Sequence, residues 1–306
     1  MEKQLRSKNT KVFVKILPVE NMSHENLKIE TNYKVMYVRR LQDFGKGAMQ
    51  FSTLPSFWRF QTDGIFFNAS QEEIYASVME DVVESALRGC DSVVLANGQT
   101  GSGKSYTISG GLSQCQRGGL LPRLLAHLFG KREDLQLEAS VSLALSMVEI
   151  RDGKLTDLLG TPQSVARRDA LKAVTVVPVH SDAEAAKLAR RGDSRRCVAA
   201  GAPYPSSHVA HSVATVHVES RSLVRSAPTT ARAKIHLVDM AGVNLVTKQA
   251  SAWLDHHQIS GANLDRLLLG RYLDQLRAAP STVCSRTSST LIRYLGDSLD
   301  PASVLR

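Results

Sequence analysis

Apolar residues along this chain fall into short clusters separated by polar turns, and most clusters have the length of a β-strand. Lys11 to Pro18 (KVFVKILP) is an apolar run that a proline ends, which predicts a buried strand. Residues 21–62 are mixed in character, and we expect hairpins and loops there. Alternating or β-branched runs predict further strands at residues 92–96, 140–150, 212–219 and 233–239.

Three other segments have the spacing of a helix. In residues 71–89 the apolar positions are Ile74, Val78, Val82, Val83 and Ala86. Gly89 stands just past the end of that pattern, as a helix C-cap does. The basic segment 183–191 and the stretch LDRLLLGRYLDQL beyond Ala250 are also predicted helices. Strands and helices without an internal repeat favour a single α/β domain over residues 1–306.

Composition bears mainly on the partner and the environment. The chain carries a formal charge of +9, which favours an acidic partner: nucleic acid, an anionic membrane or an acidic protein surface. The four cysteines are widely spaced, which argues against a disulfide framework and a zinc site. The N-terminus lacks the apolar core of a signal peptide, and no apolar run approaches the roughly 18 residues that span a bilayer. We therefore expect a soluble, intracellular protein in a reduced cytosolic setting, and charge alone leaves the three partner classes open.

The stretch ANGQTGSGKSYT, from Ala96 to Thr107, contains the pattern G-x-x-x-x-G-K-[ST]. It lies between a predicted strand and an expected helix, the context that a phosphate-binding loop (P-loop) requires; a glycine-rich turn is the structural alternative. Backbone N–H groups of such a loop surround the phosphates, its lysine neutralises the β- and γ-phosphates, and its serine ligates Mg²⁺. The expected phosphate-binding set is Gly98, Gln99, Thr100, Gly101, Ser102, Gly103, Lys104 and Ser105.

A second motif follows the apolar strand KIHLVD, which ends at Asp239. With Gly242 it supplies D-x-x-G, in which the carboxylate can hold a metal through water and the glycine N–H can meet a γ-phosphate. On its own this pattern is also typical of a simple turn after a strand. Together with the loop that begins at Gly98, it predicts a nucleotide site with Ser105 and Asp239 as the metal residues.

Four segments, in order, resemble the kinesin motor domain family. GQTGSGKSYT is similar to the family's P-loop, SMVEIRDGKLTDLL to S-Y-x-E-I-Y-N-E-x-x-x-D-L-L, LVDMAG to L-V-D-L-A-G, and LIRYLGDSL to L-T-R-L-L-Q-D-S-L. The segment from FWRF to ESAL further resembles the kinesin-9 branch. The resemblance implies a P-loop NTPase fold with a mixed, mostly parallel central sheet flanked by helices. It also implies ATP or ADP with Mg²⁺ as cofactors and microtubules, with their acidic tubulin surface, as the partner in place of DNA, RNA or a membrane.

Family roles carry over by position. The catalytic set would be Lys104, Ser207, Asp239 and Gly242. Tyr106 would lie close to the base, and Lys15 and Pro18 match the family's R-x-R-P near adenine, although Leu17 replaces its second arginine and Asn97 stands where an aromatic residue is usual. The expected location is the cytoplasm and cytoskeleton, with a cilium or flagellum by analogy to the kinesin-9 branch.

Both switch motifs depart from the family pattern. The first, N-x-x-S-S-R-S-H, aligns with YPSSHVAH and places Val209 at the arginine; a shift by one residue places His208 there instead. The second, D-L-A-G-S-E, aligns with DMAGVN, so Asn244 replaces the glutamate. In the family this arginine and glutamate form a salt bridge that positions the attacking water. Because loss of both partners strands no charge, we expect retained nucleotide binding with slow or absent hydrolysis.

The expected track-binding side also departs from the family, since residues 286–290 keep one of two positive charges of Y-R-D-S-K. Positive charges that could compensate are Arg266, Arg271, Arg277 and Arg293. A second basic cluster, Arg190 to Arg196, is typical of a solvated helix end, with Arg196 at a position the family keeps. The sequence has no heptad run for dimerisation and stops before the family's last strand, last helix and neck linker, so we expect a C-terminally incomplete motor domain.

Three functions remain open at this stage. The first is a kinesin-like ATPase of microtubule-based movement with impaired hydrolysis, and the second is a catalytically silent pseudo-motor that binds nucleotide and microtubules. The third is another P-loop phosphotransferase, which would need a lid and an acceptor pocket that no sequence feature indicates.

Overall fold

The computed structural model describes residues 10–17, 25–39, 57–110, 118–160, 164–165, 174–198, 208–224, 229–242, 256–278 and 289–299. The chain divides into two compact units, Met1–Ile74 and Tyr75–Arg306. Each unit has its own sheets, and the phosphate-binding motif belongs to the second.

The first unit contains two small sheets. β1 (Phe13–Ile16) pairs in parallel with β5 (Gly64–Phe67). The other sheet is antiparallel and contains β2 (Leu27–Ile29), β3 (Val35–Arg39) and β4 (Phe57–Gln61), in that order. The predicted first strand and the hairpins within residues 21–62 are therefore confirmed for the described residues, but the first strand is only partly buried and not buried as predicted.

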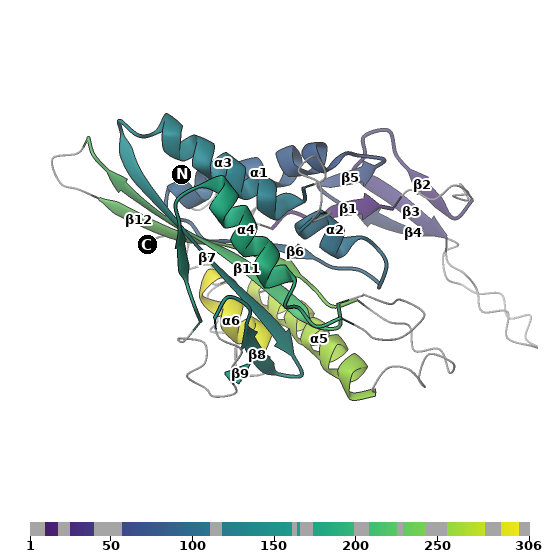
Figure 1. Cartoon of the computed structure of the whole chain (residues 1–306). Coiled ribbons are helices and arrows are strands. Elements are labelled where there is room, and N and C mark those ends of the chain that lie inside the picture. The colour runs from purple at the N-terminus through teal and green to yellow at the C-terminus, as the bar shows by residue number, and fades with distance from the viewer. Residues whose placement is uncertain are drawn as a thin grey trace, which may run out of the picture. The chain divides into compact units, whose positions relative to one another are not determined.

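The second unit is built on a seven-stranded sheet (Figure 1). Its strand order is β6 (Ser92–Ala96), β12 (Thr230–Asp239), β11 (His211–Ser222), β7 (Ala139–Arg151), β8 (Lys154–Asp157) and β9 (Ser164–Val165), with β10 (Val177–Val179) also paired to β7. The expected mixed sheet is confirmed, but only β6 and β12 pair in parallel within it. Strands that follow one another closely in the chain, such as β7 with β8 and β11 with β12, form antiparallel hairpins instead.

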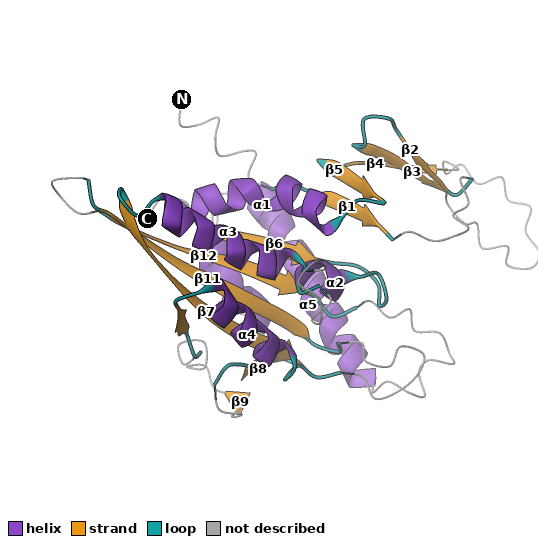
Figure 2. Ribbon diagram, turned by 45° about the horizontal axis from the view of Figure 1, so that its top comes forward, coloured by secondary structure: helices purple, strands orange, loops and turns teal. Residues whose placement is uncertain are grey.

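Helices cover both faces of this sheet (Figure 2). One layer contains α1 (Gln71–Leu87), α2 (Lys104–Ile108), α3 (Leu120–Asp134) and α4 (Asp182–Asp193). The opposite layer contains α5 (His256–Ala278) and α6 (Thr290–Leu299). No described helix is both long enough and apolar enough to cross a bilayer.

The apolar core between the sheet and helices α5 and α6 includes side chains near the ends of three long strands. Val148, Val213 and Val238 face this layer from β7, β11 and β12. Helices α5 and α6 supply the opposing side chains, which are Leu269, Tyr272, Leu291, Ile292 and Leu295. The closely packed core holds α5 and α6 against the sheet, beside the strand ends that carry the two predicted motifs.

Helix α3 was absent from the sequence predictions, although its pattern is clear in retrospect. Leu120, Leu121, Leu124, Leu125, Leu128 and Phe129 are all buried, and they recur with helical spacing. Pro122 lies in the first turn, where a proline removes no intrahelical hydrogen bond. A proline near the start of a helical pattern is thus compatible with the helix, and the signal was available in the sequence.

Candidate nucleotide site

The predicted strand, loop and helix are present at the glycine-rich motif. β6 ends at Ala96, and the loop turns through Gly101 (φ 81°) and Gly103 (φ 83°), both in the left-handed region that glycine adopts without strain. Helix α2 begins at Lys104, and its first turn is closed by the Thr107 N–H, which donates to the Gly103 carbonyl at 2.9 Å. The predicted order of strand, glycine-rich loop and helix is therefore confirmed.

Pairing of β6 with β12 brings the second motif to the first. Ala96 lies opposite Asp239 in the parallel register, and the Met240 N–H donates to the Ala96 carbonyl at 3.2 Å. The carboxyl ends of both strands therefore meet at one edge of the sheet, where ligands of open α/β sheets bind.

Asp239 is the centre of the polar contacts at this edge. The Ser105 hydroxyl donates to Asp239 Oδ2 at 2.6 Å. Arg196 Nη2 lies 2.8 Å from the same oxygen, and Arg196 Nη1 donates to Asp193 Oδ1 at 3.1 Å. The side chains of Arg196 and Asp239 are only 1% and 3% exposed, so this is a buried ion pair.

The burial of Arg196 corrects the interpretation of the basic cluster as a solvated helix end. Arg190 and Arg191 are exposed, as expected. Arg195 is also exposed and donates to the carbonyls of Leu158 and Gly160, each at 2.9 Å, whereas the buried Arg196 faces Asp239. No local sequence pattern separates these four arginines; only the position that Arg196 shares with the family signalled a special role.

The lysine and the D-x-x-G glycine also pack against the loop. Lys104 Nζ donates to the Gln99 carbonyl at 2.7 Å. Burial lowers the pKa of Lys104, and the negative charge of Asp239 acts in the opposite direction. Gly242 lies so close to Thr100 that an added Cβ would overlap Thr100 Oγ1 and come within 2.7 Å of its Cα. Both sequence motifs thus form one contiguous structure.

The contacts around Asp239 do not test the remaining predicted site residues. Tyr106 is exposed on α2, and Lys15 lies on β1 of the first unit. Ser207, Pro18 and Asn244 lie outside the described residues. Their roles in catalysis and in binding adenine stay predictions.

The first-switch segment is described from His208 onward. The Val209 N–H donates to the Cys197 carbonyl at 3.5 Å, and His208 bridges to Val198. Burial lowers the pKa of His208, and the positive charge of Arg196 lowers it further. This places His208 in the electrostatic neighbourhood of Arg196.

Oxygen ligands for a hard cation are present beside the loop. Asp239 Oδ1 is buried and has no hydrogen-bond partner within the described part of the chain. A carboxylate oxygen next to the Ser105 hydroxyl is a suitable donor set for Mg²⁺, which needs only one or two protein ligands when phosphates and water complete its coordination. The described residues contain no cluster of three or more His, Cys, Asp or Glu side chains that would hold a metal without such help.

Comparison with known proteins gives one family. A model of the kinesin motor domain matches residues 21–304. The kinesin-like protein KIF9 of Mus musculus is 28% identical over 256 residues, which cover 80% of this chain and 32% of that protein. The kinesin-like protein KLP1 of Chlamydomonas reinhardtii is 31% identical over 244 residues, covering 76% of this chain and 31% of that protein. The chain thus spans about a third of the length of these curated relatives.

Solved structures agree on the fold. A structure described as a fast kinesin matches with a TM-score of 0.77 at 23% identity, over 96% of this chain and 83% of the other. A KIF14 dimer with AMP-PNP, in complex with a microtubule, gives 0.76 at 22% identity, over 95% and 85% of the two chains. These structural matches show the fold alone, and the family model covers residues 21–304. The chain belongs to the kinesin motor domain family.

Proposed function

We propose that this chain is a kinesin-like motor domain that binds ATP or ADP with Mg²⁺ and binds microtubules, with impaired hydrolysis. The contact between the Ser105 hydroxyl and Asp239, at 2.6 Å, carries the proposal. It joins the P-loop and D-x-x-G motifs at the edge of two parallel strands, where a phosphate and a metal would be held together.

The chain's own groups match the needs of a nucleotide's phosphates. Backbone N–H groups of residues 98–105 would surround the phosphates, and Lys104 would exchange its contact with the Gln99 carbonyl for phosphate oxygens. Ser105 and Asp239 would hold Mg²⁺, which neutralises charge on the phosphates when bound. Arg196 fixes the direction of the Asp239 carboxylate through the ion pair at 2.8 Å.

Impaired hydrolysis rests on the switch residues. A valine at position 209 cannot form an ion pair, and the Asn244 side chain has no charge with which to complete one. Groups that position a reacting water or stabilise developing charge are commonly worth roughly 10²–10³ in rate each. We therefore infer that nucleotide is retained and turned over slowly; a complete absence of turnover would make the chain a pseudo-motor.

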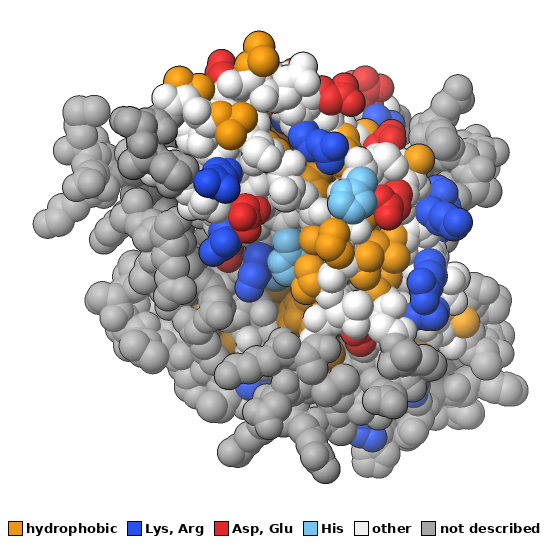
Figure 3. All heavy atoms as spheres, turned by 60° about the vertical axis from the view of Figure 1, so that its left-hand side comes forward, with side chains coloured by type: hydrophobic (Ala, Val, Ile, Leu, Met, Phe, Trp, Pro, Cys, Tyr) orange, Lys and Arg blue, Asp and Glu red, His pale blue; other side chains and the backbone are white. Residues whose placement is uncertain are grey.

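The microtubule is proposed as the partner from the family and from the net charge of +9. The described side chains of α5 weaken the electrostatic part of this attraction. Within residues 264–275, whose side chains the structure describes, the exposed residues include one basic and one acidic side chain, Arg271 and Asp274. On the face that Figure 3 brings forward, basic, acidic and apolar side chains are mixed. Binding weaker and less salt-dependent than for a strongly basic surface would follow.

We also propose that residues 1–306 act as one motor domain and that the protein is associated with the cytoskeleton. A ciliary or flagellar setting rests only on the likeness to the kinesin-9 branch.

One preparation of the protein tests this function. Fluorescent mant-ATP and mant-ADP would be titrated with Mg²⁺, and phosphate release would be followed with and without microtubules. We expect binding, abolished by Lys104→Ala and unaffected by the exposed control Lys187→Ala on α4, with little phosphate release. Brisk microtubule-stimulated release would refute impaired hydrolysis, and an absence of nucleotide binding would refute the function itself.

A further inference from the structure

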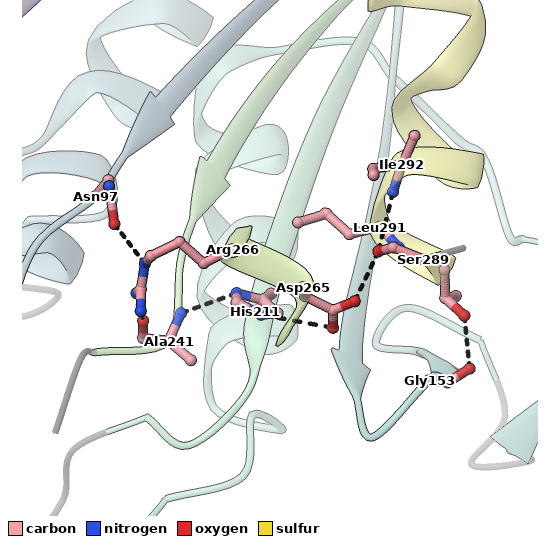
Figure 4. Close-up of polar contacts among 10 residues, drawn as sticks. Asn97, Gly153, His211, Ala241, Asp265, Arg266, Ser289, Leu291 and Ile292 are labelled. Atoms are coloured by element: carbon pink, nitrogen blue, oxygen red, sulfur yellow. Dashed lines mark hydrogen bonds and ion pairs between the residues drawn. The ribbon is translucent and has the colours of Figure 1, made fainter. Parts of the chain in front are cut away.

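Helix α5 presents its polar side chains to the sheet and its leucines to solvent at one place. Leu264 and Leu267 are 54% and 53% exposed, whereas Asp265 is 7% exposed. Asp265 and Arg266 point toward the ends of the sheet strands (Figure 4). Residues 264–267 thus depart from the amphipathic pattern that the buried Leu269 and Tyr272 follow, and such local departures occur mainly at functional sites.

Arg266 bridges the two motifs of the nucleotide site. Its Nε donates to Asn97 Oδ1 at 2.8 Å, and its Nη2 donates to the Ala241 carbonyl at 2.6 Å. Asn97 directly precedes the P-loop glycine Gly98, and Ala241 directly precedes Gly242. Partial burial lowers the pKa of Arg266.

The same peptide is held from its other side. The Ala241 N–H donates to His211 Nδ1 at 3.1 Å, which requires a neutral imidazole at that nitrogen. Burial lowers the pKa of His211 to about 4, in agreement with this neutral form. Both polar groups of the Ala241 backbone are therefore fixed by side chains from different elements, β11 and α5.

Asp265 fixes the helix that supplies Arg266. It accepts a hydrogen bond of 2.6 Å from the Ser289 hydroxyl, which in turn accepts from the N–H groups of Leu291 and Ile292 at the start of α6. His211 Nε2 lies 3.8 Å from Asp265 Oδ2, too far for a hydrogen bond. Arg266 thus extends from a helix anchored to α6.

We propose that Arg266 is a positioning residue of the nucleotide site, which with Asn97 clamps Ala241 and holds the D-x-x-G loop against the P-loop. The clamp keeps Gly242 against Thr100 and Asp239 against Ser105, so the phosphate and metal groups are arranged before a ligand binds. The inference rests on the proposed function, because it assigns Arg266 a role in holding nucleotide.

An arginine suits this role better than a lysine. The two bonds leave different nitrogens of one rigid, planar guanidinium, and a single ammonium on a flexible stem cannot reproduce that geometry. Retention of charge alone should therefore restore little.

The test compares Arg266→Met, Arg266→Lys, Asn97→Ala and the double variant Arg266→Met with Asn97→Ala in the full chain. The control is Arg191→Met, which removes an exposed guanidinium from α4. Mant-ADP with Mg²⁺ is the probe, and its release rate is the readout. We expect release about tenfold faster for Arg266→Met and about threefold faster for Arg266→Lys, with the double variant within about twofold of Arg266→Met because the two residues act as a unit.

A merely structural role would lower the urea midpoint without this selective effect on release. The clamp is overturned if Arg266→Met releases mant-ADP at the wild-type rate, if the double variant is simply additive, or if Arg191→Met has the same effect.

A second readout works without nucleotide. Amide hydrogen exchange of a peptide covering residues 240–242 should be about tenfold faster in nucleotide-free Arg266→Met and unchanged in Arg191→Met. If wild-type protein does not bind mant-ADP, the proposed nucleotide function fails, but the amide exchange rates of residues 240–242 still test the clamp. Equal exchange in wild type and Arg266→Met overturns it.

Discussion

Arg196→Met is the substitution with the sharpest consequence for the nucleotide site. Methionine keeps much of the arginine's length and apolar contact but donates no hydrogen bond. It leaves two carboxylates without their cation: Asp239, 2.8 Å away and 3% exposed, and Asp193, 3.1 Å away and 9% exposed. Removing one partner of a buried pair typically costs 3–5 kcal/mol, because the remaining charge is stranded.

Protonation sets a ceiling on this cost. A stranded carboxylate can take up a proton instead of staying charged. Protonating a carboxyl group of ordinary pKa, about 3.9, at about pH 7 costs about 4 kcal/mol. We expect Arg196→Met to lower the free energy of unfolding by about 3–4 kcal/mol near neutral pH. Because the protonation cost falls as the pH approaches the ordinary carboxyl pKa, the deficit should shrink as the pH is lowered from about 7 toward about 5.

Urea unfolding followed by circular dichroism at two pH values measures this deficit, with Arg191→Met as the exposed control on the same helix. The double variant Arg196→Met with Asp239→Asn removes the stranded charge at Asp239, and the new amide oxygen can still accept from Ser105. It should be more stable than Arg196→Met alone, which also keeps the test usable if the single variant folds poorly. A loss no larger than that of Arg191→Met, or additive losses in the double variant, would refute the reasoning.

Three further predictions follow from packing, titration and the switch residues. His236 is buried between Thr215 and Ser298, and its pKa is lowered to about 3, so only the unfolded state takes up a proton as the pH falls below about 6.5. Between about pH 7 and about pH 5, wild type should therefore lose about 2 kcal/mol more stability than His236→Asn in urea titrations. Gly192→Ala would place a Cβ 2.5 Å from Met147 Sδ and should cost about 1–3 kcal/mol, whereas Gly130→Ala, in helix α3 with nothing within 4 Å of the new Cβ, should gain about 0.5–1 kcal/mol; equal thermal shifts would contradict both. Val209→Arg combined with Asn244→Glu should raise steady-state phosphate release by more than the product of the two single changes, since the pair acts as a unit; a purely multiplicative result would exclude an ion pair.

The strands and the two nucleotide motifs could be predicted because their signals are local. β-branched runs, glycines at turns and an aspartate at the end of an apolar strand each act within a few residues. The pairing that places Ala96 opposite Asp239 was not predicted from the sequence, although both motifs were assigned to one site. Whether these residues hold a nucleotide stays a prediction.

The charged residues around the site could not be assigned from the sequence. Arg196 lies in a cluster with three other arginines around the end of helix α4, and it is buried because it faces Asp239, which lies on strand β12. Arg266 and Arg293 were named only as charges that could compensate on the track-binding side. Nothing in the sequence indicated that Arg266 donates to Asn97 and Ala241 or that Arg293 donates to Thr290 Oγ1. Helical periodicity predicts the apolar side of α5 as the buried one, and it fails where Leu264 and Leu267 face solvent.

Three cations from separate elements lie around the two motifs, and their contacts bear on what the site can hold. Lys104 comes from α2, Arg196 follows α4, and Arg266 comes from α5. Arg196 is paired with Asp239 and Asp193, and Arg266 donates to Asn97 and to the Ala241 carbonyl. Burial lowers the pKa of Lys104, and a phosphate bound at the P-loop would supply negative charge that stabilises its ammonium. The residues that the switch motifs have lost therefore reduce the case for hydrolysis, while the lysine that remains supports the case for binding.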